Sequence, residues 1–550
     1  MIHTGGPIEH SDSGRRTSRT RTVVSTIVAS AVLAGLGYGA YAGLVAGSDA
    51  DDPQVVAATA ELEKFLDAWR TVDAERAALL TDSPDPAKSL IKSVMTNLDP
   101  RTTRISAGDG EKKSAGKVSI PFTVKMSLPG AGTYAWDSRA DVAKSDGNWK
   151  VEFHTQTIHP EMVPGETLAL KTRDRAPVLD RYGDTLESAS LVGLVDARTG
   201  RGVSGLQARY DRQLTGGSGP PKSVVVVDRR SGRVVKTLTG RKAGRGRPVR
   251  TTIDPRVQRA AAQALRGVRK NAAIVAVAPS NGHILAAANL PSGMNRALEG
   301  RYPPGSTFKV VTAAALLKQG LKPTDPGQCP RFVHVNGQRF ENQGRFTLPS
   351  GSTFRDGFAH SCNTFFVNSR GRLSPSALHD TAAAFGIGGT WDVGTTTYDG
   401  GVPVASSDND MAASMIGQAR VQASPLVMAS VAATVRQGVF HQPVLVPAAV
   451  KKKYKAPARL DAEVVEALRT MMRATVTEGA GRALRGIPGA PHAKTGTAEF
   501  GTETPPRTHA WMIGYQGTRD LAWAVLLEDG GSGGADAGPV AARFLANLLG

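Results

Sequence analysis

Cysteine and histidine are scarce in this sequence of 550 residues, which contains two cysteines and 11 histidines. The histidines are scattered along the chain rather than clustered at short spacings. A zinc site needs three or four cysteine, histidine or carboxylate ligands that converge on one ion. The sequence therefore predicts no metal site, and no other motif in it predicts a cofactor.

Signatures of nucleic-acid binding are also missing, although the formal net charge of the chain is +19. Aromatic residues make up only 5% of the sequence, and no zinc-finger spacing or aromatic RNA-binding motif occurs. Lysine and arginine form no dense block outside short stretches such as 241–247. The basic surface fits anionic lipid headgroups or wall polymers better than nucleic acid, and simple solvation of the surface by arginine remains an alternative.

Charged residues are absent from positions 22–48, whereas four arginines precede this segment and three aspartates follow it closely. As a helix rising ~1.5 Å per residue, the segment would span about 40 Å, enough to cross the hydrocarbon core of a membrane. Because the basic flank stays in the cytoplasm, we expect a cytoplasmic tail at 1–21, a single-pass anchor at 22–48 in the cell membrane and an extracytoplasmic remainder. The small residues Ala40 and Ala42 leave a cleaved signal peptide as the alternative, with a mature chain that begins at Gly43.

The two cysteines, Cys329 and Cys362, both fall in the part of the chain predicted to lie outside the cytoplasm. Two thiols in an oxidising compartment often pair. Sequence spacing does not tell whether the two Cα atoms approach closely enough for a disulfide, so their pairing stays open.

Changes in hydrophobic periodicity divide the predicted exterior part into three regions, at 53–160, 165–245 and 249–550, and indicate a multidomain α+β protein. The first region begins with apolar residues at helical spacing, including Leu62, and continues with alternating segments typical of strands. The second region mixes short apolar stretches with glycine-rich turns and is typical of a connecting module. The third region, of roughly 300 residues, is long enough to hold the core of an enzyme.

Ser306 follows two prolines and a glycine and precedes an apolar segment, so it is predicted to open a buried helix. Lys309 lies three residues later on the same face of that helix, beside the serine hydroxyl. A serine hydroxyl needs a base to act as a nucleophile. Lys309 could be that base as the free amine, because burial, a helix N-terminus and a second cation each lower the pKa of a lysine. Taken alone, Ser-x-x-Lys is a weak pattern.

Two further motifs strengthen this prediction. Ser361 and Asn363 place two polar side chains in an otherwise apolar segment. Further along, the segment 494–497 (Lys-Thr-Gly-Thr) places a lysine beside hydroxyl groups, and its glycine would let a substrate approach the strand closely. Segments 510–514 and 521–527 are then predicted to be neighbouring antiparallel strands. Each motif has a structural explanation by itself, but the three in this order point to an acyl-serine enzyme.

The motifs Ser-x-x-Lys, Ser-x-Asn and Lys-Thr-Gly make the chain resemble the penicillin-recognising acyl-serine enzymes. Residues 249–550 resemble the transpeptidase domain of class B penicillin-binding proteins, which implies an antiparallel sheet flanked by helices. Residues 175–183 resemble the segment that opens the pedestal, or dimerisation-type, domain of these proteins, with departures at Ala176 and Tyr182. The region 53–160 is similar, with less specificity, to the nuclear-transport-factor-like domain of low-affinity, resistance-type members.

The resemblance implies a role for each motif residue in a peptidoglycan D,D-transpeptidase. Ser306 would attack the penultimate D-Ala carbonyl of a stem peptide while Lys309 takes its proton. Ser361 would relay a proton to the departing D-Ala, and Asn363 would bind the side-chain amide of the donor peptide. Backbone N–H groups of Ser306 and Thr497 would hold the oxyanion.

The resemblance implies that the Lys-Thr-Gly motif binds the terminal carboxylate of the substrate. Lys494 would attract this carboxylate and bias Lys309 toward its neutral form. Thr495 and Thr497 would hydrogen-bond the carboxylate, and Gly496 completes this substrate-binding set. β-Lactam antibiotics would acylate the same serine. The residue that activates the acceptor amine is not indicated by the sequence.

Several alternatives share parts of this pattern. A β-lactamase or a β-lactam sensor could carry the same three motifs, and a non-catalytic cell-wall scaffold could retain them without activity. The segments 530–534 and 217–223 match a nucleophile elbow and a phosphate-binding loop only formally. The first has no oxyanion loop and no later Asp…His order, and Pro221 removes a required N–H from the second. No glycosyltransferase pattern precedes the motifs, so a separate glycosyltransferase of the division or elongation machinery is a candidate partner.

Overall fold

The structure, a computed structural model, describes residues 51–217, 220–239 and 245–548 of the chain. Contacts between residues divide it into two compact units. The first unit consists of the described residues up to Lys92 together with Arg104–Val124 and Ala135–Glu161, and the second of Ser93–Thr103, Lys125–Tyr134 and the described residues from Met162 onward.

The predicted cytoplasmic tail at 1–21 and the predicted anchor at 22–48 lie outside the described residues, as does the alternative cleavage site before Gly43. In the described part of the chain, no helix is both long enough and apolar enough to cross a membrane. The anchor therefore stays a prediction.

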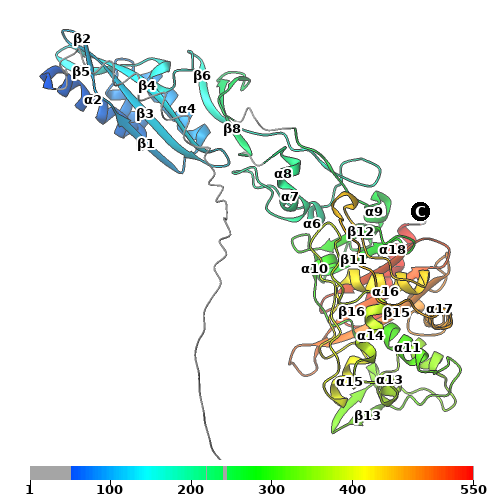
Figure 1. Ribbon diagram of the computed structural model, residues 1–550. Coiled ribbons are helices and arrows are strands. Elements are labelled where there is room, and N and C mark those ends of the chain that lie inside the picture. Colours follow the sequence, from blue (N-terminus) through cyan, green and yellow to red (C-terminus); the bar gives the residue numbers. More distant parts are fainter. Residues whose placement is uncertain (1–50, 218–219, 240–244, 549–550) are drawn as a thin grey trace, which may run out of the picture. The chain divides into compact units, whose positions relative to one another are not determined.

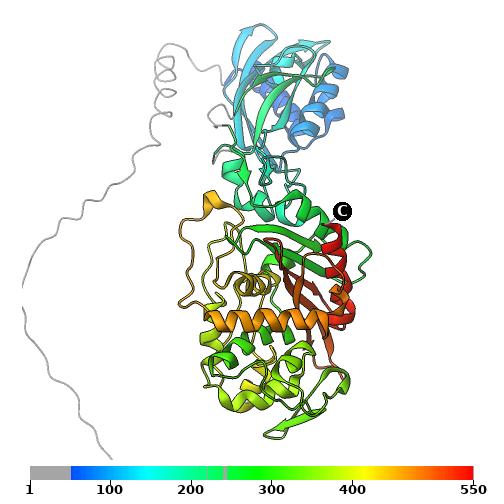
Figure 2. The ribbon, with the colours of Figure 1, turned by 90° about the vertical axis from the view of Figure 1, so that its right-hand side faces the viewer.

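The first unit contains a five-stranded sheet with helices on one side (Figures 1 and 2). The elements of this region are α2 (Pro53–Arg70), α3 (Ala74–Leu79), α4 (Pro84–Leu98), β1 (Thr102–Ala107), β2 (Glu111–Ser114), β3 (Lys117–Leu128), β4 (Gly132–Ser145), β5 (Asn148–Glu152) and α5 (Thr155–Ile158). The strand order is β1-β3-β4-β5, with β2 paired to β3. Helix α2 begins after Asp52, whose carboxylate accepts a hydrogen bond from the Gln54 N–H at 2.7 Å.

Aromatic side chains form the centre of the first unit. Trp69 of α2 is fully buried, and its ring centroid lies 6.3 Å from that of Phe122 and 6.5 Å from that of Trp136. Asp146 and Gly147 join β4 to β5 with positive φ angles of 52° and 81°, as a tight hairpin turn requires. The helix, alternating strands and hairpin expected from the sequence are therefore present.

The described residues between 162 and 250 form a three-stranded sheet, a two-stranded sheet and several short helices. Their elements are β6 (Glu166–Thr172), β7 (Val178–Leu179), α6 (Ala189–Val192), α7 (Gly205–Arg209), α8 (Asp211–Leu214), β8 (Lys222–Asp228), β9 (Val234–Thr237) and β10 (Val249–Arg250). The guanidinium of Arg175 binds the Asp211 carboxylate at 2.7 Å, and Asp180 accepts the Tyr182 N–H at 2.8 Å. The pedestal-like motif thus holds this region together locally, and a separate domain at 165–245 stays a prediction.

The three sequence motifs lie in the C-terminal part of the second unit, which is built on a five-stranded sheet. In spatial order its strands are β12 (Ile284–Leu290), β11 (Ala272–Val277), β17 (Ala522–Leu527), β16 (Arg507–Gln516) and β15 (Pro491–Phe500). Every neighbouring pair in this sheet is antiparallel. The strands predicted at 510–514 and 521–527 are confirmed as neighbours, and β15, which carries Lys-Thr-Gly, is an edge strand.

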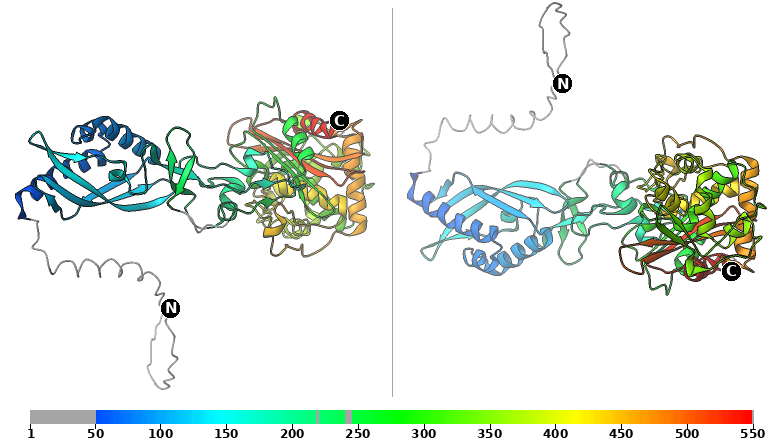
Figure 3. Two further views of the ribbon diagram at one scale, coloured as in Figure 1. Left: turned by 90° about the horizontal axis from the view of Figure 1, so that it is seen from above. Right: turned by 90° about the horizontal axis from the view of Figure 1, so that it is seen from below.

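Helices cover both faces of this sheet. One face packs against α9 (Pro255–Ala264) and α18 (Gly538–Asn547), and the other against α11 (Lys309–Lys318), α16 (Pro425–Gln437) and α17 (Ala462–Thr477). Figure 1 shows α9 beside α18, and the long helix α17 is clearest in Figures 2 and 3. Successive side chains of β17 point to opposite faces of the sheet. Trp523 belongs to the hydrophobic core shared with α18, and Ala524 to the core shared with α16.

A largely helical region follows α11 and completes the site. Its elements are β13 (Phe332–Val335), β14 (Gln338–Glu341), α12 (Phe354–Ala359), α13 (Asn363–Asn368), α14 (Ala377–Ala384) and α15 (Asp408–Ser414), and the short α10 (Arg296–Glu299) precedes the nucleophile segment. The antiparallel sheet with helices on both faces is the architecture that the resemblance to transpeptidase domains implied.

Candidate active site

A cleft of about 1280 Å³ lies in the second unit, lined by residues of β14, α13 and β15 and by adjoining loops. It brings together six of the predicted site residues: Ser306, Ser361, Asn363, Thr495, Gly496 and Thr497. The other two, Lys309 and Lys494, are fully buried (0% exposed). Motifs far apart in the sequence therefore meet at one place.

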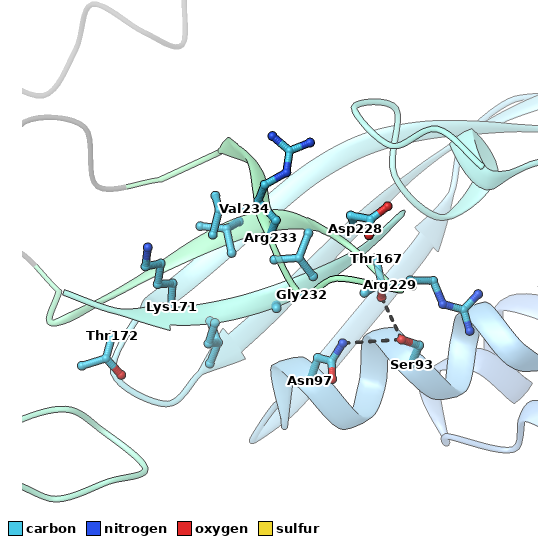
Figure 4. A pocket seen from close by; sticks show the side chains of 14 residues that line it. Ser93, Asn97, Thr167, Lys171, Thr172, Asp228, Arg229, Gly232, Arg233 and Val234 are labelled. Carbon is cyan, nitrogen blue, oxygen red and sulfur yellow. Dashed lines mark hydrogen bonds between the residues drawn. The ribbon is translucent and has the colours of Figure 1, made fainter. Parts of the chain in front are cut away.

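A second hollow in the same unit, of about 1040 Å³, lies at β6, β8 and β9 (Figure 4). The Ser93 hydroxyl at its edge donates a hydrogen bond to Thr167 Oγ1 at 3.1 Å. The lysine in its lining, Lys171, is exposed to solvent. This hollow lacks the buried pairing of serine and lysine that acyl transfer needs, so the first cleft is the candidate active site.

Ser306 lies in a short 3₁₀ helix, η2 (Gly305–Phe308), and the α-helix α11 begins only at Lys309. The sequence predicted that Ser306 opens a buried helix, and the structure places it in a buried 3₁₀ turn that runs directly into α11. Side chains three residues apart eclipse one another in a 3₁₀ helix, because the helix has three residues per turn. The tighter turn therefore still places the Ser306 hydroxyl and the Lys309 side chain on one side.

Two glycines allow η2 to lie directly against β15. Gly305 has a φ of +53°, and a Cβ at this position would meet the Thr497 carbonyl oxygen at 2.6 Å. A Cβ at Gly496 would meet the Thr307 backbone nitrogen at 2.9 Å. Any larger residue would push the two elements apart. Gly496 thus serves the packing of the nucleophile segment as well as the substrate approach that the sequence predicted.

The Lys309 amine and the Ser306 hydroxyl share one acceptor. Lys309 Nζ donates to Asn363 Oδ1 at 2.6 Å and to the Ser361 carbonyl at 2.8 Å. Ser306 Oγ donates to the same Asn363 oxygen at 3.4 Å. The nucleophile and its expected base therefore meet through Asn363, whose carboxamide oxygen holds the amine and the hydroxyl close to one another.

Burial sets the charge state of the two lysines. Burial, and then the positive charge of Lys494, lowers the pKa of Lys309 well below its usual value of 10.5. Burial also lowers the pKa of Lys494 to about 7. Lys309 Nζ lies 5.3 Å from the centroid of the Phe366 ring, and Lys494 Nζ lies 5.7 Å from that of Phe358. The direction of the shift at Lys309 favours the neutral amine, which is the form that a general base requires.

Ser361 adopts a backbone conformation that non-glycine residues rarely take, with a φ of +65°. Its N–H donates to the Phe358 carbonyl at 3.1 Å and closes the end of α12. The turn leaves the Ser361 carbonyl in contact with Lys309 and its hydroxyl 3.5 Å from the Lys309 amine. Local strain of this kind is typical of functional sites.

A disulfide holds the residue between Ser361 and Asn363. Cys362 is bonded to Cys329, with a Cα–Cα distance of 6.2 Å. The pairing that the sequence left open is therefore present in the structure. Cys362 also caps α13, because its sulfur accepts a hydrogen bond from the Phe365 N–H at 3.3 Å. The Ser-x-Asn motif is thus tied covalently to the loop that precedes β13.

The Thr497 hydroxyl is held by two residues that the sequence did not single out as functional. It donates to Gln343 Oε1 at 2.9 Å and accepts a hydrogen bond from the Gly533 N–H at 3.2 Å. Gly533 belongs to the segment 530–534, which matched a nucleophile elbow only formally. In the structure Gly533 packs directly on β15, since a Cβ at this position would meet the Gly496 carbonyl oxygen at 2.3 Å. The neighbouring Lys494 amine donates to the Thr495 carbonyl at 2.9 Å.

Comparison with known proteins decides the family. Residues 272–549 match the model of the penicillin-binding protein transpeptidase domain. The chain belongs to the penicillin-binding protein transpeptidase family. Residues 57–166 match a second model, the NTF2-like N-terminal transpeptidase domain. The resemblance to class B penicillin-binding proteins with a nuclear-transport-factor-like domain is therefore confirmed.

Mycobacterial proteins are among the relatives of this penicillin-binding protein. Peptidoglycan D,D-transpeptidase PbpA of Mycolicibacterium smegmatis is 34% identical over 383 residues, which cover 58% of this chain and 75% of the relative. The protein of the same name from Mycobacterium tuberculosis is 32% identical over 370 residues, which cover 56% of this chain and 73% of the relative.

Solved structures agree with this relationship. The crystal structure of PBPA from M. tuberculosis has a TM-score of 0.57 and 26% identity, covering 69% of this chain and all (100%) of that one. The penicillin G acyl-enzyme complex of penicillin-binding protein A from the same organism has a TM-score of 0.56 and 25% identity, with the same coverage of 69% and 100%.

Proposed function

We propose that this penicillin-binding protein is a peptidoglycan D,D-transpeptidase whose nucleophile is Ser306. The observation that carries the proposal is the convergence of Ser306 and Lys309 on Asn363 Oδ1, at 3.4 and 2.6 Å, in a cleft bounded by the Lys-Thr-Gly strand. The relatives named above support the reaction, because they carry the name peptidoglycan D,D-transpeptidase and one similar structure is a penicillin G acyl-enzyme.

In the acylation step, Ser306 Oγ attacks the carbonyl carbon of the penultimate D-Ala of a stem peptide, and its proton passes to the neutral Lys309 amine. The backbone N–H groups of Ser306 and Thr497 hold the oxyanion that forms. The amide bond to the terminal D-Ala then breaks. The departing nitrogen takes a proton that Lys309 delivers through Ser361, whose hydroxyl lies 3.5 Å from the Lys309 amine. The products are an ester on Ser306 and free D-Ala.

In the second step, the amine of another stem peptide attacks the ester carbonyl. A new amide bond forms, the bond to Ser306 breaks, and the proton lost by the amine returns to the serine through Lys309. Before acylation, Thr495 and Thr497 hydrogen-bond the terminal carboxylate of the donor peptide and Lys494 attracts it, and this carboxylate then leaves with the free D-Ala. A β-lactam ring replaces the donor amide in the first step, so penicillin acylates the same oxygen.

Labelling of the purified full-length protein with a fluorescent penicillin tests this function. We expect one covalent label that persists for hours and is absent from Ser306→Ala. Rapid release of the label would support a β-lactamase instead. Absence of label from the folded wild-type protein would support a non-catalytic cell-wall scaffold.

The proposed enzyme works at the outer side of the cell membrane, anchored by residues 22–48 with residues 1–21 in the cytoplasm. The charge-free segment and its arginine-rich flank support this placement. Mass spectrometry of the mature chain tests it, since a chain that starts at Gly43 would contradict the anchor. Because glycan polymerisation needs a different active site, the proposed partner is a glycosyltransferase of the division or elongation machinery.

A further inference from the structure

Asn342, which follows β14, is a buried carboxamide (1% exposed) beside the active site. Its nitrogen donates hydrogen bonds to the Pro330 carbonyl at 2.9 Å and to the Phe346 carbonyl at 2.8 Å. Two acceptors on the nitrogen side fix the orientation of the amide, because only its nitrogen can donate. The carboxamide oxygen is therefore turned toward α13.

The Asn342 oxygen binds the start of the helix that carries Asn363. It accepts hydrogen bonds from the Asn363 N–H at 2.8 Å and from the Thr364 N–H at 3.1 Å. The first N–H groups of a helix have no partner within the helix. Asn342 supplies that partner from another segment, and so it fixes the backbone of Asn363.

The side chain of Asn363 is held by the residue next to Asn342. The Glu341 carbonyl accepts a hydrogen bond from Asn363 Nδ2 at 2.8 Å. With its nitrogen held there, the Asn363 carboxamide presents its oxygen to Lys309 and Ser306. The chain leaving β14 therefore determines where the shared acceptor lies.

We propose that Asn342 is a positioning residue for acylation, because it holds Asn363 where the Asn363 carboxamide oxygen can keep Lys309 beside Ser306. It acts through Asn363, and the proposal rests on the proposed function of Ser306 and Lys309. Removal of the Asn342 side chain leaves two N–H groups at the start of α13 without their acceptor. Asn363 then loses its fixed position, and a misplacement of about 1 Å at a reacting group slows catalysis strongly.

The charge state of Lys309 reports this positioning. An acceptor for the Lys309 ammonium favours the protonated form, so a displaced Asn363 oxygen lowers the pKa of Lys309 further. Acylation needs the neutral amine, so the acylation rate falls at low pH as Lys309 is protonated. This acid limb of the pH profile therefore moves to lower pH when the pKa of Lys309 is lowered. Lys494 is the charged group that acts on the pKa of Lys309. The other titratable side chains on elements around α11 are Arg339 and Glu341 on β14, Arg355 and Asp356 on α12, His379 and Asp380 on α14, Glu463, Glu466, Arg469 and Arg473 on α17, and His492 and Glu499 on β15.

The test measures acylation of the full-length protein by fluorescent penicillin between about pH 5 and pH 9, at concentrations that separate affinity from the maximal rate. For Asn342→Ala we expect a maximal rate about tenfold lower, with affinity changed less than about twofold. Its acid limb should move down by about half a pH unit. Asn342→Asp keeps the acceptor for both N–H groups, loses the two hydrogen bonds that the nitrogen donates to carbonyls, and adds a negative charge. It should therefore recover only part of the rate and move the acid limb upward.

Gln442 offers a matched control, because it is another buried carboxamide (2% exposed) that joins two loops in the same unit. It accepts the Tyr454 N–H at 2.6 Å and donates to the Asp392 carbonyl at 2.8 Å. Gln442→Ala should lower the melting temperature and leave the acid limb in place. A shift as large as that of Asn342→Ala would overturn the positioning role.

The outcomes separate this proposal from the proposed function. A wild-type protein that takes no label would refute the function itself. Ser306-dependent labelling together with an unchanged rate and acid limb in folded Asn342→Ala would refute only the positioning role. If Asn342→Ala does not fold, Asn342→Asp decides, and an unmoved acid limb in that variant would refute the positioning role.

Discussion

The amine nitrogen of Lys309 lies 2.6 Å from the carboxamide oxygen of Asn363. This contact joins the Ser-x-x-Lys and Ser-x-Asn motifs, and the Ser306 hydroxyl bonds the same oxygen at 3.4 Å. Lys309 also contacts the Ser361 carbonyl at 2.8 Å, so its amine is fixed on one side by the second motif. The contacts within this site and next to it lead to five predictions.

Replacement of the proposed base should separate activity from stability. Lys309→Met keeps a long unbranched side chain in a fully buried position and removes the amine. We expect the rate of acylation by fluorescent penicillin to fall by at least about 10²-fold, with a melting temperature equal to or above that of the wild type. Lys318→Met, at the exposed end of the same helix, is the control and should acylate normally. Wild-type acylation in Lys309→Met would rule out Lys309 as the base.

Stability should depend on pH through Lys494. Burial lowers the pKa of Lys494 to about 7 in the folded protein, from an ordinary value of 10.5 in the unfolded chain. Between these values the unfolded chain binds more protons than the folded one, so the free energy of unfolding rises with pH. Below about pH 7 both states are protonated, and the full cost of burying the cation is present.

The slope from this one group is on the order of 1 kcal/mol per pH unit. Urea denaturation at several pH values between about 7 and 10 measures it for the wild type and for Lys494→Met, in which the slope should be smaller. Lys455→Met, on an exposed loop, should keep the wild-type slope. Identical slopes in the wild type and Lys494→Met would show that Lys494 does not titrate in this range.

The Gln343 side chain should slow acylation, because it occupies the Thr497 hydroxyl before a substrate binds. Its carboxamide oxygen accepts the Thr497 hydroxyl at 2.9 Å, and this bond must break before Thr497 can donate to a substrate carboxylate. A neutral hydrogen bond contributes about 1 kcal/mol, so Gln343→Ala should raise the second-order acylation constant about fivefold. Gln338→Ala is the control, because Gln338 bonds Asn409 (3.0 Å) from the same hairpin. A slower Gln343→Ala would mean that Gln343 assists the substrate.

Gly305 should tolerate no side chain. Its φ is +53°, and a Cβ would meet the Thr497 carbonyl at 2.6 Å. We expect Gly305→Ala to lose about 2 kcal/mol or more of stability and most of its acylation, because η2 must move away from β15. Gly351→Ala is the control. Gly351 also has a positive φ (93°), but a Cβ there would meet open space, so its loss of stability measures the backbone strain alone. Equal losses in the two variants, measured by thermal unfolding and labelling, would contradict the close-contact explanation.

The disulfide should stabilise the second unit. It closes a loop with a sequence separation of 33, and the chain-entropy account gives about 3–4 kcal/mol for a loop of this size. Cys329→Ser with Cys362→Ser should therefore lower the midpoint of urea denaturation and, because Cys362 lies between Ser361 and Asn363, slow acylation too. Reducing buffer provides the control, because it breaks the disulfide of the wild type. The midpoint of urea denaturation of the wild type should then approach that of the double variant. A double variant as stable as the oxidised wild type would contradict this role.

Local patterns in the sequence predicted much of the fold. The helical spacing around Leu62 and the alternation within β3 are properties of consecutive residues, and both elements are present. Gly496 was expected to let a substrate approach the strand, which stays a prediction, and the structure shows that this glycine leaves room for η2. Ser306 was predicted to open a buried helix, and the structure adds that the first turn of this helix is the 3₁₀ helix η2, which precedes α11.

The sequence by itself determined which chemical groups the protein brings to its reaction: two serines, two lysines, an asparagine and a pair of threonines in a fixed order. Only the tertiary structure decided how they meet. Asn342 and Gln343 carry no sequence signal of function, since an asparagine close to a glycine is typical of any turn and the glutamine belongs to no recognised motif. They become parts of the site because folding brings β14 against α13 and β15, and contacts between distant segments are set by packing rather than by sequence spacing.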